Sequence, residues 1–124
     1  MTDDRAAPSA AEAPHPPLDI AVLQAAAGEA VGMLKLLANP DRLLLLCQLT
    51  QGEQCVSDLE NRLGIRQPTL SQQLGVLRQE GLVQTRREGK HIFYRVCNDR
   101  ALTILQLLYQ LYCPPAMQAS PLQP

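Results

Sequence analysis

Four cysteines are the side chains in this sequence best suited to chemistry that responds to the surroundings. They are Cys47, Cys55, Cys97 and Cys113. No two have CxxC spacing, and four are too few for the disulfide framework of a small secreted domain. We therefore expect thiols in a reducing, cytoplasmic compartment, where a thiol can be a nucleophile, a metal ligand or a small buried apolar group. Cys55 and Cys97 are interpreted as ordinary helix-start and strand-end residues.

Cys47 and Cys113 both stand in apolar segments. Cys47 follows four leucines in "LLLLC", so a buried cysteine of low reactivity is the simplest interpretation. Cys113 ends the last apolar segment, because the two prolines that follow it in "QLYCPP" cannot continue a helix. Arg42 and Arg100 are candidate cations for favouring a thiolate at these positions.

A basic stretch between residues 61 and 95 is the second feature that points to a function. It contains seven basic and two acidic side chains, a net charge of about +5, whereas the whole chain carries −1. This asymmetry favours a polyanionic partner, although a solvated basic face has the same composition. The sequence has no nucleophile–base pair, paired carboxylates or phosphate-binding glycine loop, so we do not expect an enzyme.

Apolar residues at helical spacing predict two helices in the first part of the chain. One covers 18–37 and the other covers 40–49. Asn39 and Pro40 fit the start of the second helix, because asparagine is a good N-cap and proline is tolerated in the first turn. Residues 1–17 are rich in alanine and proline and poor in large apolar side chains, so we expect a disordered arm there.

Two shorter helices are expected next. The third covers 55–63, where Ser57 and Glu60 have the spacing of a capping box. The fourth begins with a second cap-and-proline signal, Gln67–Pro68. Two consecutive helices of this kind are typical of helix-turn-helix proteins.

The fourth helix is amphipathic in a way that suits a groove. Leu70, Leu74 and Leu77 fall on one stripe, which we expect to be buried. The opposite side carries hydrogen-bonding groups and no large apolar side chain. Its residues are Pro68, Thr69, Ser71, Gln72, Gly75 and Gln79.

After Gly81 the apolar period changes from helical to alternating. Residues 82–87 and 91–96 are predicted to form two antiparallel strands joined by a turn that contains a glycine. A fifth helix, 99–113, carries apolar residues on more than one face, so we expect a second copy of the chain to cover one side.

These elements predict one domain, mainly α-helical with a small β-hairpin, at residues 18–113. A proline-rich tail follows at 114–124. The expected fold is a winged helix-turn-helix that forms a homodimer through its first and last helices and places its fourth helix in the major groove. The longest apolar segment, 101–113, is too short and too polar to span a bilayer, so we expect no membrane partner.

The sequence also resembles a known family. The stretches "LLANPDRLLLLCQL", "QPTLSQQLGVLRQEGLV" and "RREGKHIFYRV" are similar to the ArsR/SmtB family of small dimeric bacterial repressors, over residues 30–113. A thiol in "LLLLCQL" and another in "LYCP" resemble the BigR/SqrR group of reactive-sulfur sensors. This resemblance implies a repressor in which Cys47 and Cys113 become joined by a disulfide or polysulfide when persulfides accumulate. Release of DNA would then allow expression of sulfide-detoxification genes.

Candidate DNA contacts follow from residue type and position. Hydrogen-bonding side chains at the fourth helix are expected to read bases, namely Gln67, Thr69, Ser71, Gln72 and Gln73. Basic side chains are expected to hold phosphates, with the hairpin reaching the minor groove, and these are Arg66, Arg78, Arg87 and Lys90. The partner is then an inverted-repeat operator with half-sites about one helical turn apart. We expect His91 to be a turn residue, and we expect no metal and no cofactor.

Metal sensing and protein binding remain alternatives to sulfur sensing. The family's arsenite signature resembles E-x-C-V-C-D-L, but this chain has Ser57 where the second thiol would stand, which removes a ligand for a soft ion. A zinc site in the last helix is also incomplete, because 99–113 contain Asp99 but no histidine. Several of the four thiols could still converge on Cu(I) or As(III), and a winged helix can serve protein contacts alone.

Overall fold

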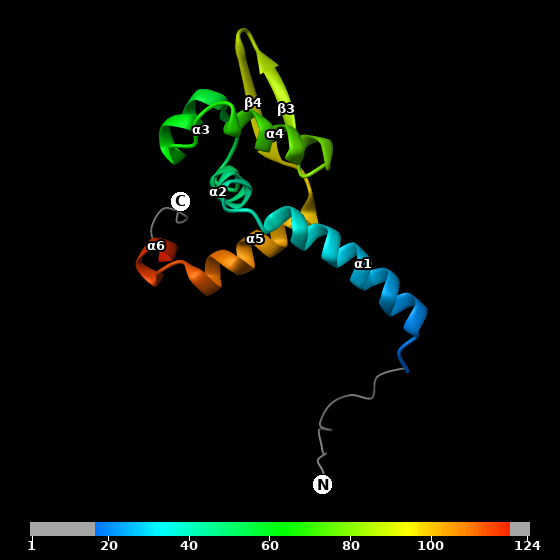
Figure 1. The fold of residues 1–124 in the computed structure, drawn as a ribbon. Coiled ribbons are helices and arrows are strands. Elements are labelled where there is room, and N and C mark those ends of the chain that lie inside the picture. The colour runs from blue at the N-terminus through cyan, green and yellow to red at the C-terminus, as the bar shows by residue number, and fades with distance from the viewer. Residues whose placement is uncertain (1–16, 120–124) are drawn as a thin grey trace. The chain divides into compact units, whose positions relative to one another are not determined.

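The computed structural model describes residues 17–119, which form a mainly helical fold with one small antiparallel sheet (Figure 1). The elements in chain order are α1 (Ile20–Leu37), α2 (Pro40–Leu49), β2 (Gln54–Cys55), α3 (Val56–Leu63), α4 (Thr69–Gln79), β3 (Val83–Glu88), β4 (His91–Val96), α5 (Asp99–Tyr112) and α6 (Pro115–Ala119). This order confirms the predicted winged helix-turn-helix fold. Most of the predicted arm, 1–16, and the end of the predicted tail, 120–124, lie outside the described residues.

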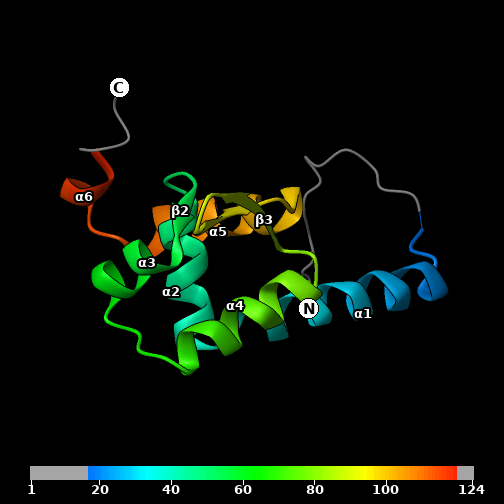
Figure 2. The ribbon, with the colours of Figure 1, turned by 90° about the horizontal axis from the view of Figure 1, so that it is seen from above.

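The chain divides into two units, and the boundary falls within α1. Met1–Val31 is the first unit and Gly32–Pro124 is the second. In the second unit, leucines from α2 and α4 occupy the centre of the core, and they are at most 1% exposed: Leu45, Leu46, Leu70, Leu74 and Leu77. Leu49 of α2 and side chains from the neighbouring segments complete this core, and the latter are Leu37, Leu59, Ile65, Leu82, Val83, Ala101 and Leu105. The predicted leucine stripe of α4 is confirmed, and α4 lies along the edge of the fold beside α2 (Figure 2).

Local caps explain where several helices begin and end. The side chain of Asn39 accepts a hydrogen bond from the N–H of Arg42 at 3.0 Å, and Pro40 occupies the first turn of α2, as predicted. Asn98 caps α5 in the same way. The predicted capping box of α3 is wrong, because α3 begins after Cys55 and no side chain caps it.

The sheet contains one strand that the sequence analysis does not predict. Its order is β2-β4-β3, and β2 pairs with β4 through Gln54 opposite Tyr94 and Cys55 opposite Phe93. Strand β2 is also attached to the end of α2. Gln48 and Gln54 exchange two hydrogen bonds, from Gln48 Nε2 to Gln54 Oε1 at 3.2 Å and from Gln54 Nε2 to the Gln48 carbonyl at 3.0 Å. The sheet is therefore attached to α2 through β2, which pairs with the central strand, β4.

The hairpin itself matches the prediction closely. Strands β3 and β4 pair with Glu88 opposite His91, so that two residues, Gly89 and Lys90, form the turn. Gly89 has a φ of 62°, a conformation that glycine adopts without strain. The tight turn keeps the hairpin short and holds its tip in one position.

The end of the chain differs from the predicted tail. Helix α5 ends at Tyr112, and after two prolines the short helix α6 begins at Pro115. Proline fits the first turn of a helix because it needs no N–H partner there. Residues 115–119 are therefore helical, whereas the sequence predicts a proline-rich tail there.

Helix α1 is apolar along its length and largely exposed. Val22, Val31 and Leu34 are between 47% and 65% exposed, whereas Leu37 at the end of the helix is buried. By length and composition alone α1 could cross a membrane, since its 18 residues have a mean hydropathy of 1.5. From the sequence only 101–113 is considered as a possible membrane span, and α1 is overlooked, because its alanines raise the mean hydropathy without adding large side chains.

Neighbouring leucines in α2 provide a test of this core. Leu45 is fully buried and Leu44 is 48% exposed. We expect Leu45→Ala to lower the free energy of unfolding by about 2–5 kcal/mol, because it leaves a cavity in the core. Leu44→Ala is the matched control and should cost less than half as much. Urea unfolding followed by circular dichroism measures both, and equal losses would contradict the assignment of the core.

Candidate nucleic-acid interface and thiol site

Helix α4 presents a slim polar surface opposite its buried leucines. Ser71, Gln72 and Gly75 are exposed, and the side chain of Gln72 makes no hydrogen bond with the residues described, although its N–H donates to the Pro68 carbonyl oxygen. A Cβ atom added to Gly75 would meet nothing within 4 Å. Glycine inside a helix costs about 1 kcal/mol relative to alanine, so packing within the protein does not explain this residue. The surface is narrow enough for a partner to approach the helix backbone closely.

Two predicted base-reading side chains bind each other at the start of α4. The helix begins at Thr69, and Pro68 occupies the N-cap position, where it makes no side-chain hydrogen bond. Instead, Gln67 Oε1 accepts hydrogen bonds from the N–H of Ser71 at 3.1 Å and from its hydroxyl at 2.7 Å. Gln67 thus satisfies an N–H of the first turn and remains exposed with Ser71.

Gln73, another predicted base contact, is half-buried and tied to α2. Its Oε1 accepts a hydrogen bond from Arg42 Nη1 at 3.0 Å. The same guanidinium donates to the carbonyl oxygens of Leu36 at 2.7 Å and Lys35 at 3.1 Å. Arg42 therefore satisfies carbonyls at the end of α1 that have no partner within the helix, and it joins α4 to α2.

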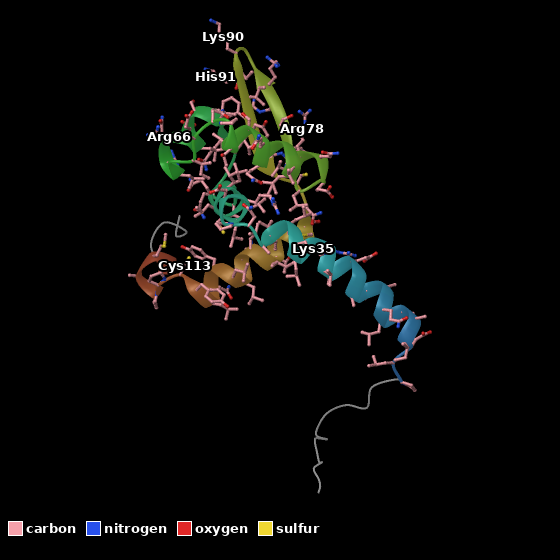
Figure 3. The ribbon with its side chains drawn as sticks, in the orientation of Figure 1. Lys35, Arg66, Arg78, Lys90, His91 and Cys113 are labelled. Carbon is pink, nitrogen blue, oxygen red and sulfur yellow. The ribbon has the colours of Figure 1, made fainter. Side chains whose placement is uncertain are left out.

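The predicted phosphate-binding residues lie around the hairpin and α4. Arg66, Arg78, Arg87 and Lys90 are all exposed. Lys90 and His91 lie at the tip of the hairpin (Figure 3). Arg66 and Arg78 lie below them in the same view, and all four residues are above Cys113. A basic surface is thus separated from the end of the chain that carries the last thiol.

Arg86 differs from its neighbour Arg87 because carboxylates balance its charge. Arg86 Nη2 lies 2.7 Å from Glu53 Oε1, and Nη1 lies 3.0 Å from Glu88 Oε1. Its guanidinium also lies 4.8 Å from the centre of the Phe93 ring. Hydrogen bonding from Arg86 lowers the pKa of Glu53, so this carboxylate stays ionised. Arg86 therefore attaches the middle of the hairpin to the segment that precedes β2.

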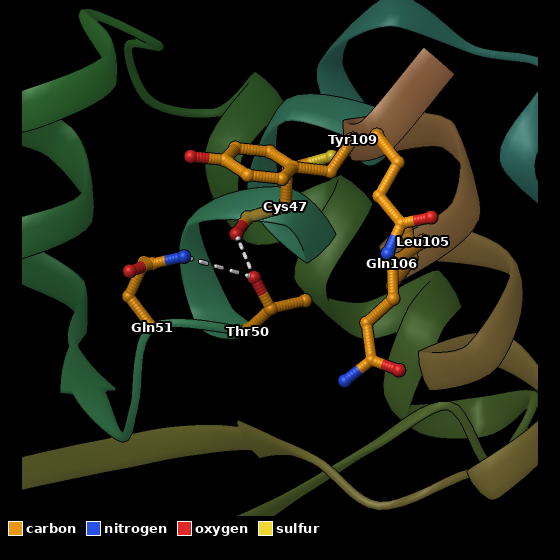
Figure 4. A pocket seen from close by; sticks show the side chains of 7 residues that line it. Cys47, Thr50, Gln51, Leu105, Gln106 and Tyr109 are labelled. Atoms are coloured by element: carbon orange, nitrogen blue, oxygen red, sulfur yellow. Dashed lines mark hydrogen bonds between the residues drawn. The ribbon is translucent and has the colours of Figure 1, made fainter. Parts of the chain in front are cut away.

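Cys47 is half-buried where α2 faces α5. It lines a pocket of about 350 Å³ between these helices (Figure 4). Burial raises the pKa of the Cys47 thiol, and Cys113 raises it further by electrostatic repulsion. The expectation that Arg42 or Arg100 favours a thiolate at Cys47 is wrong, because neither cation shifts this pKa and Arg42 binds the end of α1.

Cys113 stands directly after α5 and is half-buried. Its N–H donates to the carbonyl oxygen of Tyr109 at 3.0 Å, and the hydroxyl of Tyr109 donates to the carbonyl oxygen of Met117 at 3.0 Å. These bonds hold the segment around Cys113 against α5. All four cysteines are thiols. Tyr109 also lines the pocket beside Cys47, so the turn of α5 that ends at Cys113 lies next to Cys47.

Comparisons with known proteins agree with this architecture. Residues 39–85 match the family described as "Bacterial regulatory protein, arsR family". The chain is 52% identical over 104 residues to the Biofilm growth-associated repressor of Agrobacterium fabrum (strain C58), and the match covers 80% of this chain and 89% of that protein. The chain belongs to the arsR family of bacterial regulatory proteins. The family resemblance noted in the sequence is thereby confirmed.

Solved structures support the same assignment for this arsR-family protein. The transcriptional repressor BigR from Xylella fastidiosa has a TM-score of 0.72 and 45% identity, over 78% of this chain and 99% of that one. Reduced HlyU from Vibrio cholerae N16961 has a TM-score of 0.72 and 39% identity, over 75% of this chain and 98% of that one. These relatives are transcriptional regulators and not enzymes. The arsR-family chain is accordingly a DNA-binding transcriptional regulator.

The other two cysteines of this arsR-family protein have local partners. Cys55 is buried at the start of α3, where its Sγ lies 3.3 Å from Ser57 Oγ and donates to Asp58 Oδ2 at 3.3 Å. Cys97 is exposed, and its Sγ lies 3.5 Å from the carbonyl oxygen of Gly81. Within the part of the chain that the structure describes, no three His, Cys, Asp or Glu side chains converge as metal ligands would.

Sequence reasoning found the two thiols but missed the polar residues around Cys47. Thr50 and Gln51 lie directly after α2, and Gln106 and Gln110 lie on α5. The two glutamines of α5 are four residues apart in an otherwise apolar helix, so they fall on one face. That spacing was the available signal for a polar site on this side of α5.

The raised pKa of Cys47 predicts how its reactivity depends on pH. A thiol whose folded-state pKa lies above its unfolded value has a smaller thiolate fraction at every pH below that pKa. We expect the rate of Cys47 alkylation by iodoacetamide to keep rising at pH values where the same cysteine in the urea-unfolded chain has levelled off. Mass spectrometry of the Cys47 peptide measures both profiles. A folded profile that levels off at a lower pH than the unfolded one would contradict the shift.

Proposed function

We propose that this protein is a cytoplasmic, dimeric transcriptional repressor that senses reactive sulfur. In the reduced state it binds an inverted-repeat operator. When persulfides accumulate, Cys47 and Cys113 become joined by a disulfide or polysulfide, DNA is released, and sulfide-detoxification genes are expressed. The observation that carries the sensing part of this proposal is where the two cysteines lie: Cys47 and Tyr109 line one pocket, and the N–H of Cys113 donates to the Tyr109 carbonyl oxygen at 3.0 Å.

The polar surface of α4 supports its role as the DNA-reading helix. A glutamine amide can donate to and accept from adenine, and short hydroxyl side chains allow close approach to base edges. The side chain of Gln72 is exposed and makes no hydrogen bond with the described residues, and Gly75 leaves the helix backbone open nearby. Gln67, Thr69, Ser71 and Gln73 are the remaining proposed base contacts, with Gln73 held by Arg42.

Exposed apolar side chains support a dimer that uses α1 and α5. Leu107 and Leu111 of α5 are 52% and 64% exposed and fall on one face, and α1 exposes Val22 and Leu34. A monomer would leave this apolar surface in water, which a second copy can cover. The twofold symmetry of such a dimer matches an inverted repeat.

The linking chemistry needs no reagent other than the persulfide. A Cys47 thiolate attacks the outer sulfur of R–S–SH, the S–S bond of the donor breaks, and R–SH leaves with the proton of the Cys47 thiol. Cys113 then attacks the Cys47 sulfur of the new persulfide and expels H₂S. The result is two cysteines oxidised to a disulfide and one persulfide reduced to R–SH and H₂S. A further persulfide donates each additional sulfur of a longer link.

The link acts through the difference in strain between two shapes of the dimer. A bond between α2 and the end of α5 releases DNA only if it fits a DNA-incompetent arrangement better. A difference of roughly 3 kcal/mol would weaken binding about 150-fold. Loss of affinity on this scale is sufficient for derepression.

Single serine variants test the thiol pair. We expect Cys47→Ser and Cys113→Ser to bind an operator fragment from the protein's own promoter as tightly as the reduced wild type. Both should lose the release of DNA on treatment with polysulfide, because each lacks one partner of the link. Fluorescence anisotropy with labelled DNA measures this, and Cys97→Ser is the control that keeps its response. Release from both variants at the wild-type level would reject the pair.

The two arginines in β3 test the role of the wing. Arg87 is exposed, whereas Arg86 is bound by Glu53 and Glu88. We expect Arg87→Ala to reduce the slope of log Kd against log salt by about one, as loss of one phosphate contact does. Arg86→Ala should change the slope by less than half as much. Equal changes in slope would show that the carboxylates do not distinguish the two arginines.

A further inference from the structure

One side chain within the second unit joins three helices. Arg42 belongs to the first turn of α2, and all three nitrogens of its guanidinium donate hydrogen bonds. Nε donates to the carbonyl oxygen of Leu36 at 2.7 Å and Nη2 donates to that of Lys35 at 3.1 Å. Nη1 donates to Gln73 Oε1 at 3.0 Å. Arg42 therefore connects the last turn of α1 to α4 through the start of α2.

The place of this arginine in the sequence does not favour α2 itself. The N-terminus of a helix carries a partial positive charge, so a cation in the first turn is unfavourable there. The C-terminus of α1 carries the opposite partial charge, and its last carbonyl groups have no partner within the helix. The charge of Arg42 thus stabilises the junction between two helices, and it does not stabilise the start of its own helix.

Hydrogen bonds fix the angle at this junction more firmly than apolar contacts do. Near the end of α1, Met33, Leu36 and Leu37 pack against the core. Apolar contact is non-directional, so on its own it would allow this end of α1 to slide or tilt. A guanidinium is planar and donates in fixed directions. The bonds from its three nitrogens therefore define the position of the last turn of α1 relative to α4.

The last turn of α1 also carries part of the surface that we propose for the dimer. Leu34 is 55% exposed and precedes Lys35, whose carbonyl oxygen Arg42 binds. With half-sites about one helical turn apart, each α4 would lie about 17 Å from the twofold axis. If α4 could tilt by about 10° relative to the dimer surface, it would shift by up to about 3 Å, nearly the rise of one base pair. A small freedom at this junction would therefore change the half-site spacing that the dimer fits.

We propose that Arg42 is a positioning residue that sets the half-site spacing accepted by the dimer. It fixes α4 relative to the last turn of α1, and the second copy of the chain covers that turn. The inference rests on the proposed dimer and its inverted-repeat operator, and it adds the residue that controls their fit. Arg42 acts through Gln73 and two backbone carbonyls, so its role does not depend on a contact with DNA.

The test varies the distance between the half-sites. The probes are the operator fragment from the protein's own promoter, the same fragment with one base pair inserted at its centre, and a fragment with one half-site scrambled. One inserted base pair moves a half-site by about 3.4 Å and turns it by about 34°. We expect the reduced wild-type dimer to bind the natural operator roughly tenfold more tightly than the inserted one, because both α4 helices engage only at a matching spacing. Fluorescence anisotropy with labelled DNA measures each affinity.

Arg42→Lys is the decisive variant because it keeps the charge and loses the planar fork. We expect its preference for the natural spacing to fall below roughly threefold, because α4 is no longer held at one angle. Its affinity for the single half-site should stay within about twofold of the wild-type value, since the same side chains contact the bases, and this also shows that the variant is folded. Arg62→Lys, the same change at an exposed residue of α3, is the matched control and should keep the wild-type preference.

Arg42→Gln tests the alternative that Arg42 contacts a phosphate. We expect the slope of log Kd against log salt for the single half-site to stay unchanged, because the guanidinium is bound to α1 and α4. A slope reduced by about one would make Arg42 a phosphate contact and would overturn the positioning role.

The outcomes separate this inference from the function on which it rests. Wild-type protein that binds both spacings equally contradicts the proposed dimer on an inverted repeat, and the inference falls with it. A wild-type preference that Arg42→Lys retains in full contradicts the inference alone. Equal weakening of all three probes by Arg42→Lys also overturns it, because Arg42 would then support α4 within one copy without setting the spacing.

Discussion

The packing of leucines between α2, α4 and α5 is the constraint on which the rest of this structure depends. Leu45 and Leu46 of α2 are fully buried against Leu74 of α4 and Leu105 of α5. Burial of one side of α4 turns its hydroxyl and amide side chains toward solvent, and burial of Leu46 leaves the next residue, Cys47, between core and surface. The same hydrophobic contacts thus expose the polar surface of α4 and half-bury the thiol. A mutation that loosened this core would affect the polar surface and the environment of Cys47 together.

The fold was predictable wherever its signals are local. Asn39 and Asn98 cap helices that begin next to them, and the alternation of residues 91–96 is sufficient to identify a strand of the hairpin. Strand β2 was not predictable in the same way, because two residues carry no period and its existence depends on pairing with β4. Helix α6 was missed for a related reason. Its prolines were read as stops, but a proline that ends one helix can also begin the next.

The candidate site was predictable by residue type, and its contacts were not. The polar side of α4 follows from the spacing of its leucines, and Cys47 and Cys113 were found through the family resemblance. The bond from Arg42 to Gln73 joins residues 31 positions apart, so no local pattern reveals it. The same limit applies to the environment of Cys47. The pKa of the Cys47 thiol depends on whether the helix that packs against it buries the thiol or brings a cation close. In this fold burial raises that pKa.

Helix α2 is hydrogen-bonded to both elements that we propose contact the operator. Near its start, Arg42 binds Gln73 of α4. At its end, Gln48 is paired with Gln54, whose strand joins the hairpin. Cys47 lies between these two attachments on α2. A force on its sulfur therefore acts on the helix that holds both elements. In the dimer that we propose, α4 and the hairpin would then move together as one rigid body relative to the other copy, and no series of side-chain rearrangements is needed to carry the signal.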